Sequence, residues 1–328
     1  MAPENAPPGR REVLLRLLRA GGLGAGAAGL AFWLRSRSRY PEEPAAPYLK
    51  RSFTVPSDPG VPEMAIVQGE DPRRLLRRAI EELGGIRRFI SRGDVVLIKP
   101  NVSWDRTPEQ AANTNPEVVA EMARLCFEGG AKTVIVTDVS INEPRSCYQR
   151  SGVADAAGRE GARVLLPEER KFKRVDLGGE VLREWPVFEP FLNADKMINL
   201  PIAKHHSLTK VTLGLKNWYG ILGGQRQRLH QRIHESLADL GDFMRPTLTV
   251  IDAYRVLVRG GPGGGNFEDV ALKKTLIAGT DPVALDACAA KAYWDLDAES
   301  LLYLELASRR GMGTPHFEKL RTRAVSLQ

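Results

Sequence analysis

The sequence predicts an α/β protein built on a three-layer, mainly parallel sheet, with a small antiparallel hairpin insertion. The first observation is that seven short apolar runs recur along the chain, several of them separated by stretches of helical length. Such runs are typical of strands buried on both faces, and their alternation with helices is typical of parallel sheets. The second is that Asn115-Pro116 and Asp281-Pro282 each place a capping side chain before a proline, which indicates a helix start.

The apolar runs predict strands at residues 64–67, 95–98, 133–137, 163–166, 196–200, 248–251 and 275–278. Helices are predicted at residues 72–90, 116–128, 149–160, 228–241 and 282–293. Residues 172–191 alternate apolar and charged side chains around Gly178-Gly179, a pattern typical of an antiparallel hairpin. Asp281 fits a helix cap, whereas Asp286 lies inside the last predicted helix, where it can reach the core or the sheet edge.

The first forty residues predict an export signal. Arg10-Arg11, followed by Glu-Val-Leu-Leu, resembles a bacterial twin-arginine leader, and residues 20–34 carry no charge. As a helix, this stretch would span about 22 Å, short of a hydrocarbon core of about 30 Å, so a membrane span is disfavoured. No Ala-x-Ala site follows and arginines stand at 35, 37 and 39, so both a cleaved signal and a retained anchor stay open. We expect a protein exported by the twin-arginine machinery to the periplasmic or cell-surface side.

Residues 41–62 are interpreted as a Pro-rich linker and residues 63–328 as a single α/β domain. The chain has 47 Lys and Arg against 40 Asp and Glu, but residues 1–51 hold nine and four of these. The rest is therefore close to neutral, which gives no bulk electrostatic case for nucleic acid as a partner. Cys126, Cys147 and Cys288 lie far apart, and three scattered thiols cannot supply a four-cysteine iron-sulfur site. Cys126 and Cys288 sit in apolar helical patterns that predict buried thiols.

Polar residues follow the predicted strands at what should be one edge of the sheet, where ligands of such folds bind. The predicted ligand-binding residues, basic or amide in character, are Lys99, Asn101, Lys204, Lys216 and Asn217. The residues predicted to be catalytic, or to hold a metal ion, are Asp138, His205 and Asp252. Lysines and amides together indicate a small anionic ligand, and mixed oxygen and nitrogen ligands suit zinc, manganese or iron better than calcium.

Each of these residues also has a structural interpretation. Lys99 can be a solvated strand end, and Asp138 can cap the turn that follows its strand. Adjacent His205 and His206 would point opposite ways in an extended chain, so at most one faces the site, and we expect His205. The segment around Lys216 can be a glycine turn instead of an anion-binding loop.

Three further patterns are weaker. His230 and His234 are four residues apart, but Gln231 replaces the glutamate of a zinc-protease motif, so solvent-facing stacking is preferred over metal ligation. The run 260–265 predicts a mobile lid or a plain surface loop, since it lacks the Gly-Lys-Ser/Thr ending of a phosphate-binding loop. A nucleophile elbow and a dinucleotide fingerprint are both missing, which disfavours a serine hydrolase and a dinucleotide enzyme.

Taken in order, several motifs resemble the family called domain of unknown function 362, over about residues 63–292. The motifs are Ile98-Lys99-Pro100-Asn101, Asn113-Thr114-Asn115-Pro116, Val136-Thr137-Asp138, Asn199-Leu200-Pro201, Lys204-His205-His206, Gly214-Leu215-Lys216-Asn217 with Gly220, Ile251-Asp252-Ala253, and Ala278-Gly279-Thr280-Asp281-Pro282-Val283-Ala284-Leu285-Asp286-Ala287. Many relatives carry twin-arginine leaders or ferredoxin-like cysteine cassettes. This chain lacks the cassette, so the resemblance implies no iron-sulfur cluster of its own.

The sequence thus favours an exported enzyme or ligand-binding protein that binds a small anionic ligand at the carboxyl edge of the strands. A divalent metal is the cofactor that the acidic and imidazole residues suggest, although neither its identity nor the reaction follows from the residues. The alternative is a non-catalytic accessory protein that docks on a redox or cofactor-bearing partner through the same polar edge.

Overall fold

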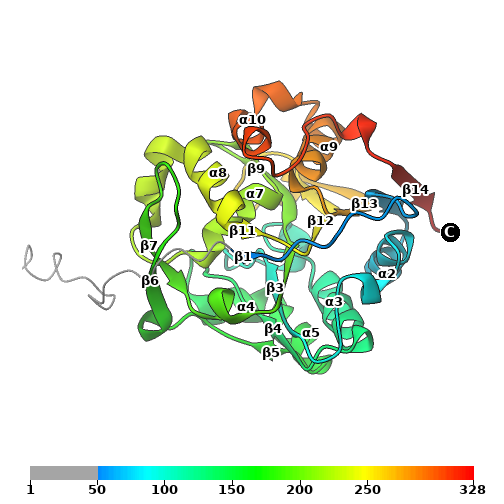
Figure 1. The fold of residues 1–328 in the computed structure, drawn as a ribbon, viewed down its shortest axis with the longest axis horizontal. Coiled ribbons are helices and arrows are strands. Elements are labelled where there is room, and N and C mark those ends of the chain that lie inside the picture. The colour runs from blue at the N-terminus through cyan, green and yellow to red at the C-terminus, as the bar shows by residue number, and fades with distance from the viewer. Residues whose placement is uncertain (1–50) are drawn as a thin grey trace, which may run out of the picture. The chain divides into compact units, whose positions relative to one another are not determined.

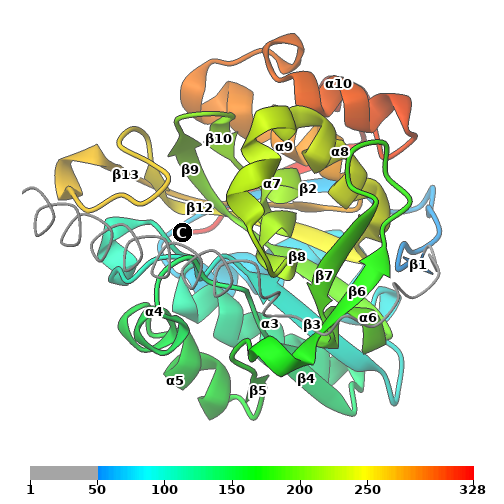
Figure 2. The same ribbon diagram turned by 90° about the vertical axis from the view of Figure 1, so that its left-hand side faces the viewer.

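Helices cover both faces of a central sheet in residues 51–328, the part of the chain that the computed structural model describes (Figure 1, Figure 2). The predicted export signal, residues 1–40, and residues 41–50 of the predicted linker lie outside the described residues. Among residues 51–328, no helix combines the length and the apolar character needed to cross a membrane.

Within the described residues, ten strands form the central sheet, and most neighbouring pairs are parallel, as predicted. The spatial order is β14, β2, β13, β12, β8, β3, β4, β5, with β9 beside β12 and β10 beside β9. The strands are β2 (Met64–Gln68), β3 (Val95–Pro100), β4 (Thr133–Val136), β5 (Arg163–Val164), β8 (Lys196–Leu200), β9 (Ile202–His206), β10 (Lys210–Thr212), β12 (Leu248–Leu257), β13 (Val270–Gly279) and β14 (Thr322–Ser326). All seven predicted apolar runs are strands, whereas β9, β10 and β14 were not predicted.

The sheet is mixed because β12 and β13 form an antiparallel pair, and β13 is also antiparallel to β2. The glycine-rich run 260–265 lies in the connection between β12 and β13. Two contacts fix it to other segments: Gly261 N donates to His205 Nδ1 (3.2 Å), and Gly265 O accepts from Gln110 Nε2 (3.0 Å). These contacts favour the surface-loop interpretation over a mobile lid. The predicted hairpin is also confirmed, since β6 (Phe172–Asp176) and β7 (Glu184–Phe188) pair antiparallel.

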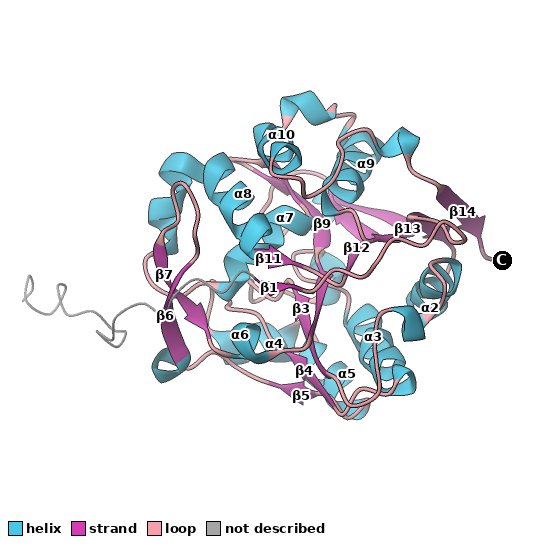
Figure 3. Cartoon of the chain, viewed as in Figure 1, coloured by secondary structure: helices cyan, strands magenta, loops and turns pink. Residues whose placement is uncertain are grey.

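The helices lie in two layers, which Figure 3 shows on either side of the strands. One layer holds α2 (Pro72–Glu82), α3 (Pro116–Gly129), α4 (Pro144–Arg150) and α5 (Val153–Arg159), and the other holds α7 (Gly214–Asn217), α8 (Ile233–Phe243), α9 (Pro282–Trp294) and α10 (Leu302–Arg309). The two predicted caps are confirmed: Asn115 accepts from Glu117 N, and Asp281 accepts from Ala284 N.

Three predicted helices differ from the observed ones. The helix predicted at 72–90 stops at the end of α2. Gly84 and Gly85 adopt positive φ angles of 94° and 82°, and a right-handed helix cannot continue through such angles. The helix predicted at 149–160 is split between α4 and α5 at Gly152, whose φ is 73°. The third, predicted at 228–241, starts as a 3₁₀ turn (Arg226–Arg232) before α8 begins.

The alternation of side chains along β3 decides which of them reach the candidate site. Val96 and Ile98 pack into the apolar core shared with α2 and α3. Leu97 and Lys99 must point to the other face, because successive side chains of a strand alternate. Lys99 is accordingly in contact with Asn217, at the end of α7. A basic side chain is thus buried between the sheet and the α7 layer.

Asp286 of α9 holds the first turn of α7 in place. Its carboxylate accepts from Gly214 N (2.6 Å) and Leu215 N (3.0 Å), and Gly214 O accepts from Asn199 Nδ2 (2.9 Å) on β8. Burial raises the pKa of Asp286 to about 7. Because α7 is a single short turn, these bonds from two neighbouring elements fix the positions of Lys216 and Asn217.

We expect Asp286→Ala to lower the free energy of unfolding by about 3 kcal/mol, because two backbone donors lose a carboxylate partner in a buried position. Asp286→Asn keeps one acceptor oxygen and should lose less. Denaturant unfolding monitored by circular dichroism measures both. Glu81→Ala, at an exposed position of α2, is the control and should stay within about 0.5 kcal/mol of the wild type. An Asp286→Ala protein as stable as this control would contradict the role of Asp286.

Candidate functional site

A buried ion pair lies where β3 and β4 end. Lys99 Nζ lies 2.6 Å from Asp138 Oδ1, and both side chains are fully buried. The ammonium also donates to Pro100 O (2.8 Å) and to Asn217 Oδ1 (2.9 Å). Burial lowers the pKa of Lys99, and Asp138 opposes this effect. Three oxygens therefore surround three ammonium hydrogens, an arrangement that suits the charged form of lysine.

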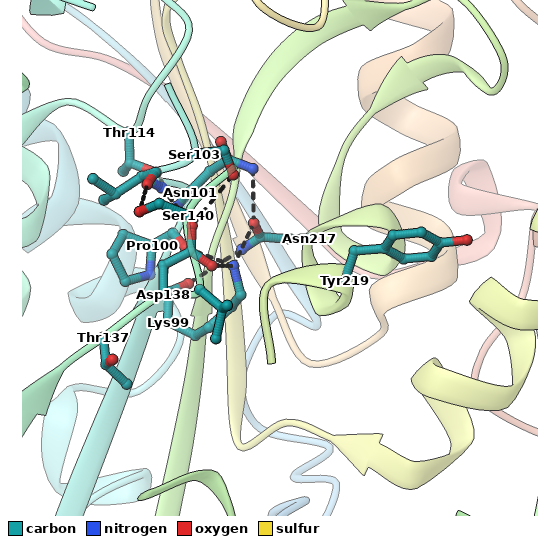
Figure 4. Close-up of polar contacts among 12 residues, drawn as sticks. Lys99, Pro100, Asn101, Ser103, Thr114, Thr137, Asp138, Ser140, Asn217 and Tyr219 are labelled. Carbon is teal, nitrogen blue, oxygen red and sulfur yellow. Dashed lines mark hydrogen bonds and ion pairs between the residues drawn. The ribbon is translucent and has the colours of Figure 1, made fainter. Parts of the chain in front are cut away.

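Asn217 joins this ion pair to the strands on either side. Its Oδ1 accepts from Lys99 Nζ and from Asn101 Nδ2 (3.0 Å), while its Nδ2 donates to Asn199 Oδ1 (2.8 Å) and to Lys99 O (3.2 Å). Figure 4 shows Lys99, Asn101, Asp138 and Asn217 converging on one point. Asp138 Oδ2 accepts from Val102 N (2.7 Å). The cluster thus connects β3, the chain after β4, β8 and α7.

Gly220 covers the ion pair. It lies in the short 3₁₀ turn Trp218–Ile221 that follows α7. A methyl group at this position would overlap Asp138 Oδ1 and would lie 2.6 Å from Lys99 Nζ, closer than real Cβ atoms approach other heavy atoms. The absence of a side chain at Gly220 is therefore a packing requirement, and it lets the backbone close over the two charges.

A cavity of about 460 Å³ opens above this cluster. Its lining comes from the strand ends, the turn after α7 and the segments that follow them: Asn101, Ser103, Trp104, Ile141, Lys204, His206, Ser207, Leu208, Thr212, Lys216, Asn217, Tyr219, Gly220, Gly224, Arg226, Gln227, His230 and Pro262. The size lies within the range of small-molecule sites, about 300–1,000 Å³. Among these described residues, Lys204, Lys216 and Arg226 are cationic and none is an Asp or Glu, so the lining favours anions.

The three cations are held differently. Lys204 Nζ donates to Asn101 Oδ1 (2.9 Å) and to Ala112 O (2.6 Å). Arg226 donates to Val139 O (2.7 Å) and Ser140 O (2.8 Å) from two guanidinium nitrogens. Lys216 Nζ lies 3.6 Å from the centre of the Tyr219 ring, and within residues 51–328 no hydrogen-bond acceptor contacts it. Burial, with a smaller contribution from neighbouring cations, lowers the pKa of Lys204 and of Lys216 to about 7, and Asp138 opposes the shift of Lys204.

His206 adds a neutral donor to the wall of the cavity. Its Nδ1 accepts from Leu208 N (3.1 Å) and lies 3.4 Å from Thr209 N. Burial, followed by repulsion from Lys216 and Lys204, lowers the pKa of His206 to about 3. Since Nδ1 is an acceptor, the proton of the neutral ring is on Nε2, which can donate to a ligand.

The remaining wall is aromatic and apolar. Tyr219 stacks on His230, with ring centres 6.0 Å apart and planes 9° from parallel. Ile141 and Leu208 are more than half exposed although they are large and apolar. Together with Trp104 and Pro262 they line the cavity. A ligand of this cavity would therefore combine an anionic group with an apolar part.

Of the predicted ligand-binding residues, Asn101, Lys204, Lys216 and Asn217 line the cavity, whereas Lys99 lies beneath it. Asp138 is also beneath the cavity, where its Oδ1 contacts Lys99 Nζ and its Oδ2 accepts from Val102 N. The alternative interpretation of Lys99, a solvated strand end, is wrong because its side chain is fully buried.

The structure does not bring Asp138, His205 and Asp252 together as a metal site. Within residues 51–328, no group of three or more His, Cys, Asp or Glu side chains is placed to hold a metal ion. Asp252 lies inside β12, which continues beyond the apolar run, and its oxygens accept from Asn115 N (2.7 Å) and Tyr254 N (3.0 Å). Burial raises the pKa of Asp252 to about 6. Its role is to join β12 to the start of α3.

His206, not His205, reaches the cavity. Lys204 and His206 share one face of β9 because side chains alternate along a strand, and His205 points to the other face, where its Nδ1 accepts from Gly261 N. Lys204 and His206 are two residues apart, so their side chains share one face of a strand. Once Lys204 is placed in the site, this spacing in the sequence selects His206. Arg226 and Tyr219 were also missed, since both follow α7 outside any strand.

His230 and His234 do not form a pair. His230 lies in the 3₁₀ turn before α8 and stacks on Tyr219, while His234 lies in α8 and stacks on Tyr303 with ring centres 6.2 Å apart. The helical spacing that predicted a shared face does not apply, because the turn is 3₁₀ at His230. The buried positions of Cys126 and Cys288 are confirmed.

The fold and the site define an α/β protein with a cation-lined cavity at the carboxyl edge of its parallel strands. The chain belongs to the family described as domain of unknown function (DUF362), whose sequence model matches residues 96–291. A thylakoid-associated protein of Synechocystis sp. is 28% identical over 219 residues, which cover 64% of this chain and 66% of that protein. The chain thus spans just under two thirds of the length of this curated relative.

Two solved structures are similar to parts of the chain. One is the lactate racemase apoprotein from Thermoanaerobacterium thermosaccharolyticum, with a TM-score of 0.40 and 12% identity, covering 68% of this chain and 56% of that one. The other is a protein from Thermotoga maritima, with a TM-score of 0.36 and 13% identity, covering 74% of this chain and 60% of that one. Both likenesses are too remote to indicate an activity for this chain.

We expect Gly220→Ala to lower the free energy of unfolding by about 3 kcal/mol, because the added methyl group must separate Lys99 from Asp138, and breaking a buried ion pair is strongly destabilising. Denaturant unfolding measures the loss. Gly158→Ala is the matched control: Gly158 lies in α5 with open space around its Cβ position, so alanine should raise stability by up to about 1 kcal/mol. Similar stabilities of the two variants would show that the segment over the ion pair shifts freely.

Proposed function

We propose that this protein binds a small organic anion with an apolar part in the cavity at the strand edge, and that this anion is a substrate. The observation that carries the proposal is the charge of the lining: three cations, a neutral imidazole donor and two asparagine amides, without a carboxylate among the described residues. Opposite charges attract each other more strongly in a concave, partly buried site than on an open surface, because the surroundings of such a site screen them less.

Lys216 supports the proposal most directly. A buried ammonium without a hydrogen-bond acceptor is costly, and an anionic group in the cavity would supply the acceptor that the described residues do not. Lys204, Arg226 and His206 would surround the same group. The Tyr219 ring and the apolar rim, Trp104, Ile141 and Leu208, would face the remainder of the ligand.

We further propose that the domain works outside the cytoplasm. The leader-like pattern at Arg10-Arg11 supports this, and the rival accessory function would place the same cavity against a redox partner there. The anionic ligand is preferred because the cavity has the volume of a small-molecule site and a recessed polar base.

Phenylpropionate should bind to this cavity, and phenylpropanol, which has the same ring and chain without the charge, should not. Lys216→Met should weaken phenylpropionate binding about tenfold, equivalent to about 1.4 kcal/mol, because one charged partner is lost. Isothermal titration calorimetry measures each affinity. Lys273→Met, at an exposed position of β13, is the control and should bind as the wild type does. Equal binding of the acid and the alcohol would contradict anion recognition, and absence of any binding would favour the accessory function.

The affinity for phenylpropionate should fall as the pH rises from 6 to 9. Lys204 and Lys216 have pKa values lowered to about 7 in the free protein, so both are largely protonated near pH 6 and largely neutral above about pH 8. An anion favours the protonated forms, and binding therefore takes up protons. Titrations in buffers of different ionisation enthalpy measure this uptake. An affinity independent of pH would show that neither amine contacts the ligand.

Replacing Arg10 and Arg11 together with lysine should keep the full-length chain in the cytoplasm of a bacterial host that has the twin-arginine route. Arg16→Lys with Arg19→Lys is the matched control and should leave export unchanged, since these arginines lie outside the pair. Cell fractionation with an immunoblot measures the distribution. Equal export of both variants would remove the leader interpretation.

A further inference from the structure

The amino group of Lys216 differs from those of the other two buried lysines. Lys99 Nζ contacts three oxygens and Lys204 Nζ donates to two, so fixed acceptors hold both amino groups in place. Lys216 has only the face of the Tyr219 ring beside it, although its residue is 8% exposed. Its nitrogen is therefore the buried amine that is open to the cavity.

The surroundings of Lys216 also favour the neutral amine, which is the nucleophilic form. Burial, then the charges of Arg226 and Lys99, lowers its pKa to about 7, so about half of the molecules carry a neutral amine at pH 7. A solvated lysine, with a pKa of about 10.4, would have very little neutral amine at that pH. The charged or titratable groups around it are Lys99, Lys204, His206, Arg226, Tyr219 and His230.

We propose that Lys216 is a catalytic nucleophile that forms an imine with the carbonyl carbon of a 2-oxo carboxylate bound in the cavity. This inference rests on the proposed anion site and names the class of its substrate. Lys204, Arg226 and the Nε2 hydrogen of His206 bind the carboxylate. The apolar rim and the Tyr219–His230 stack face the side chain of the oxo acid.

The step needs no further reactant. Nζ of the neutral amine attacks the carbonyl carbon, so a C–N bond forms and the π electron pair of the carbonyl moves to oxygen. Both hydrogens of the amine then leave with that oxygen as water, the C–O bond breaks, and a C=N double bond remains. Protonation of this nitrogen from solvent gives an iminium, which withdraws electrons from the bonds next to the former carbonyl carbon. A lysine that forms such an imine therefore promotes reactions in which one of those neighbouring bonds breaks or forms.

Phenylpyruvate and phenylpropionate test the inference, because they share ring and carboxylate and differ in the oxo group. The full-length protein is incubated with each acid, treated with borohydride, digested and examined by mass spectrometry. We expect a reduced phenylpyruvate adduct on Lys216, suppressed at least tenfold by excess phenylpropionate. The adduct should be absent from Lys216→Met and Lys216→Arg and unchanged in Lys273→Met. Lys216→Met and Lys216→Arg should both unfold cooperatively in denaturant, as the wild type does, which shows that a missing adduct is not due to misfolding.

The pH profile separates the nucleophile from the anion site. Adduct formation should rise as the pH increases through about 7, following the neutral amine, whereas phenylpropionate binding falls over the same range. Phenylpropionate binding without an adduct on Lys216 would overturn the inference and leave the anion site intact. An adduct on Lys204 instead would also overturn it. If neither acid binds, the proposed function fails as well.

Discussion

The ion pair between Lys99 and Asp138 is the interaction on which the rest of the site depends. Two buried opposite charges are stable only when further hydrogen bonds support them, and here Pro100 O and Asn217 accept from Lys99, while Val102 N donates to Asp138. The two charges and their partners come from three segments, the end of β3, the chain after β4 and the turn of α7, so the ion pair positions all three. Gly220 then closes over the pair because it has no side chain.

This arrangement explains why the cavity above is cationic. Asp138 faces Lys99 below the cavity floor and does not enter the lining. Asn101 accepts from Lys204 and donates to Asn217, which connects the floor to the second lysine. Lys216 follows two residues after the start of α7 and has no such partner. The positive charge that remains unpaired is thus concentrated at one amine, next to an aromatic ring.

Asp252 and His205 do not line the cavity, and these two differences from the expected positions have a common physical cause. Asp252 was assigned to a strand end because the apolar run stops at Ile251, but β12 continues to Leu257 and both oxygens of Asp252 bind backbone amides. His205 was preferred over His206 without the face of the strand being known. The apolar pattern of a sequence indicates where a strand is buried. The hydrogen-bonding partners of the strand decide where it ends and which of its faces is covered. Those partners, such as Asn115 N and Gly261 N, lie far away in the sequence.

The sequence by itself determined seven of the ten strands described in the central sheet, two helix caps, the hairpin and the supply of basic and amide side chains near the sheet edge, because these follow from local periodicity and local turn chemistry. The four cavity residues Asn101, Lys204, Lys216 and Asn217 were predicted for that reason. Only the tertiary structure decided that Lys99 is a buried support, that Asp138 is its counterion and that Lys216 is free. The difference between a free and an occupied lysine depends on acceptors such as Ala112 O and Asn217 Oδ1, which approach only after segments more than ninety residues apart have packed together.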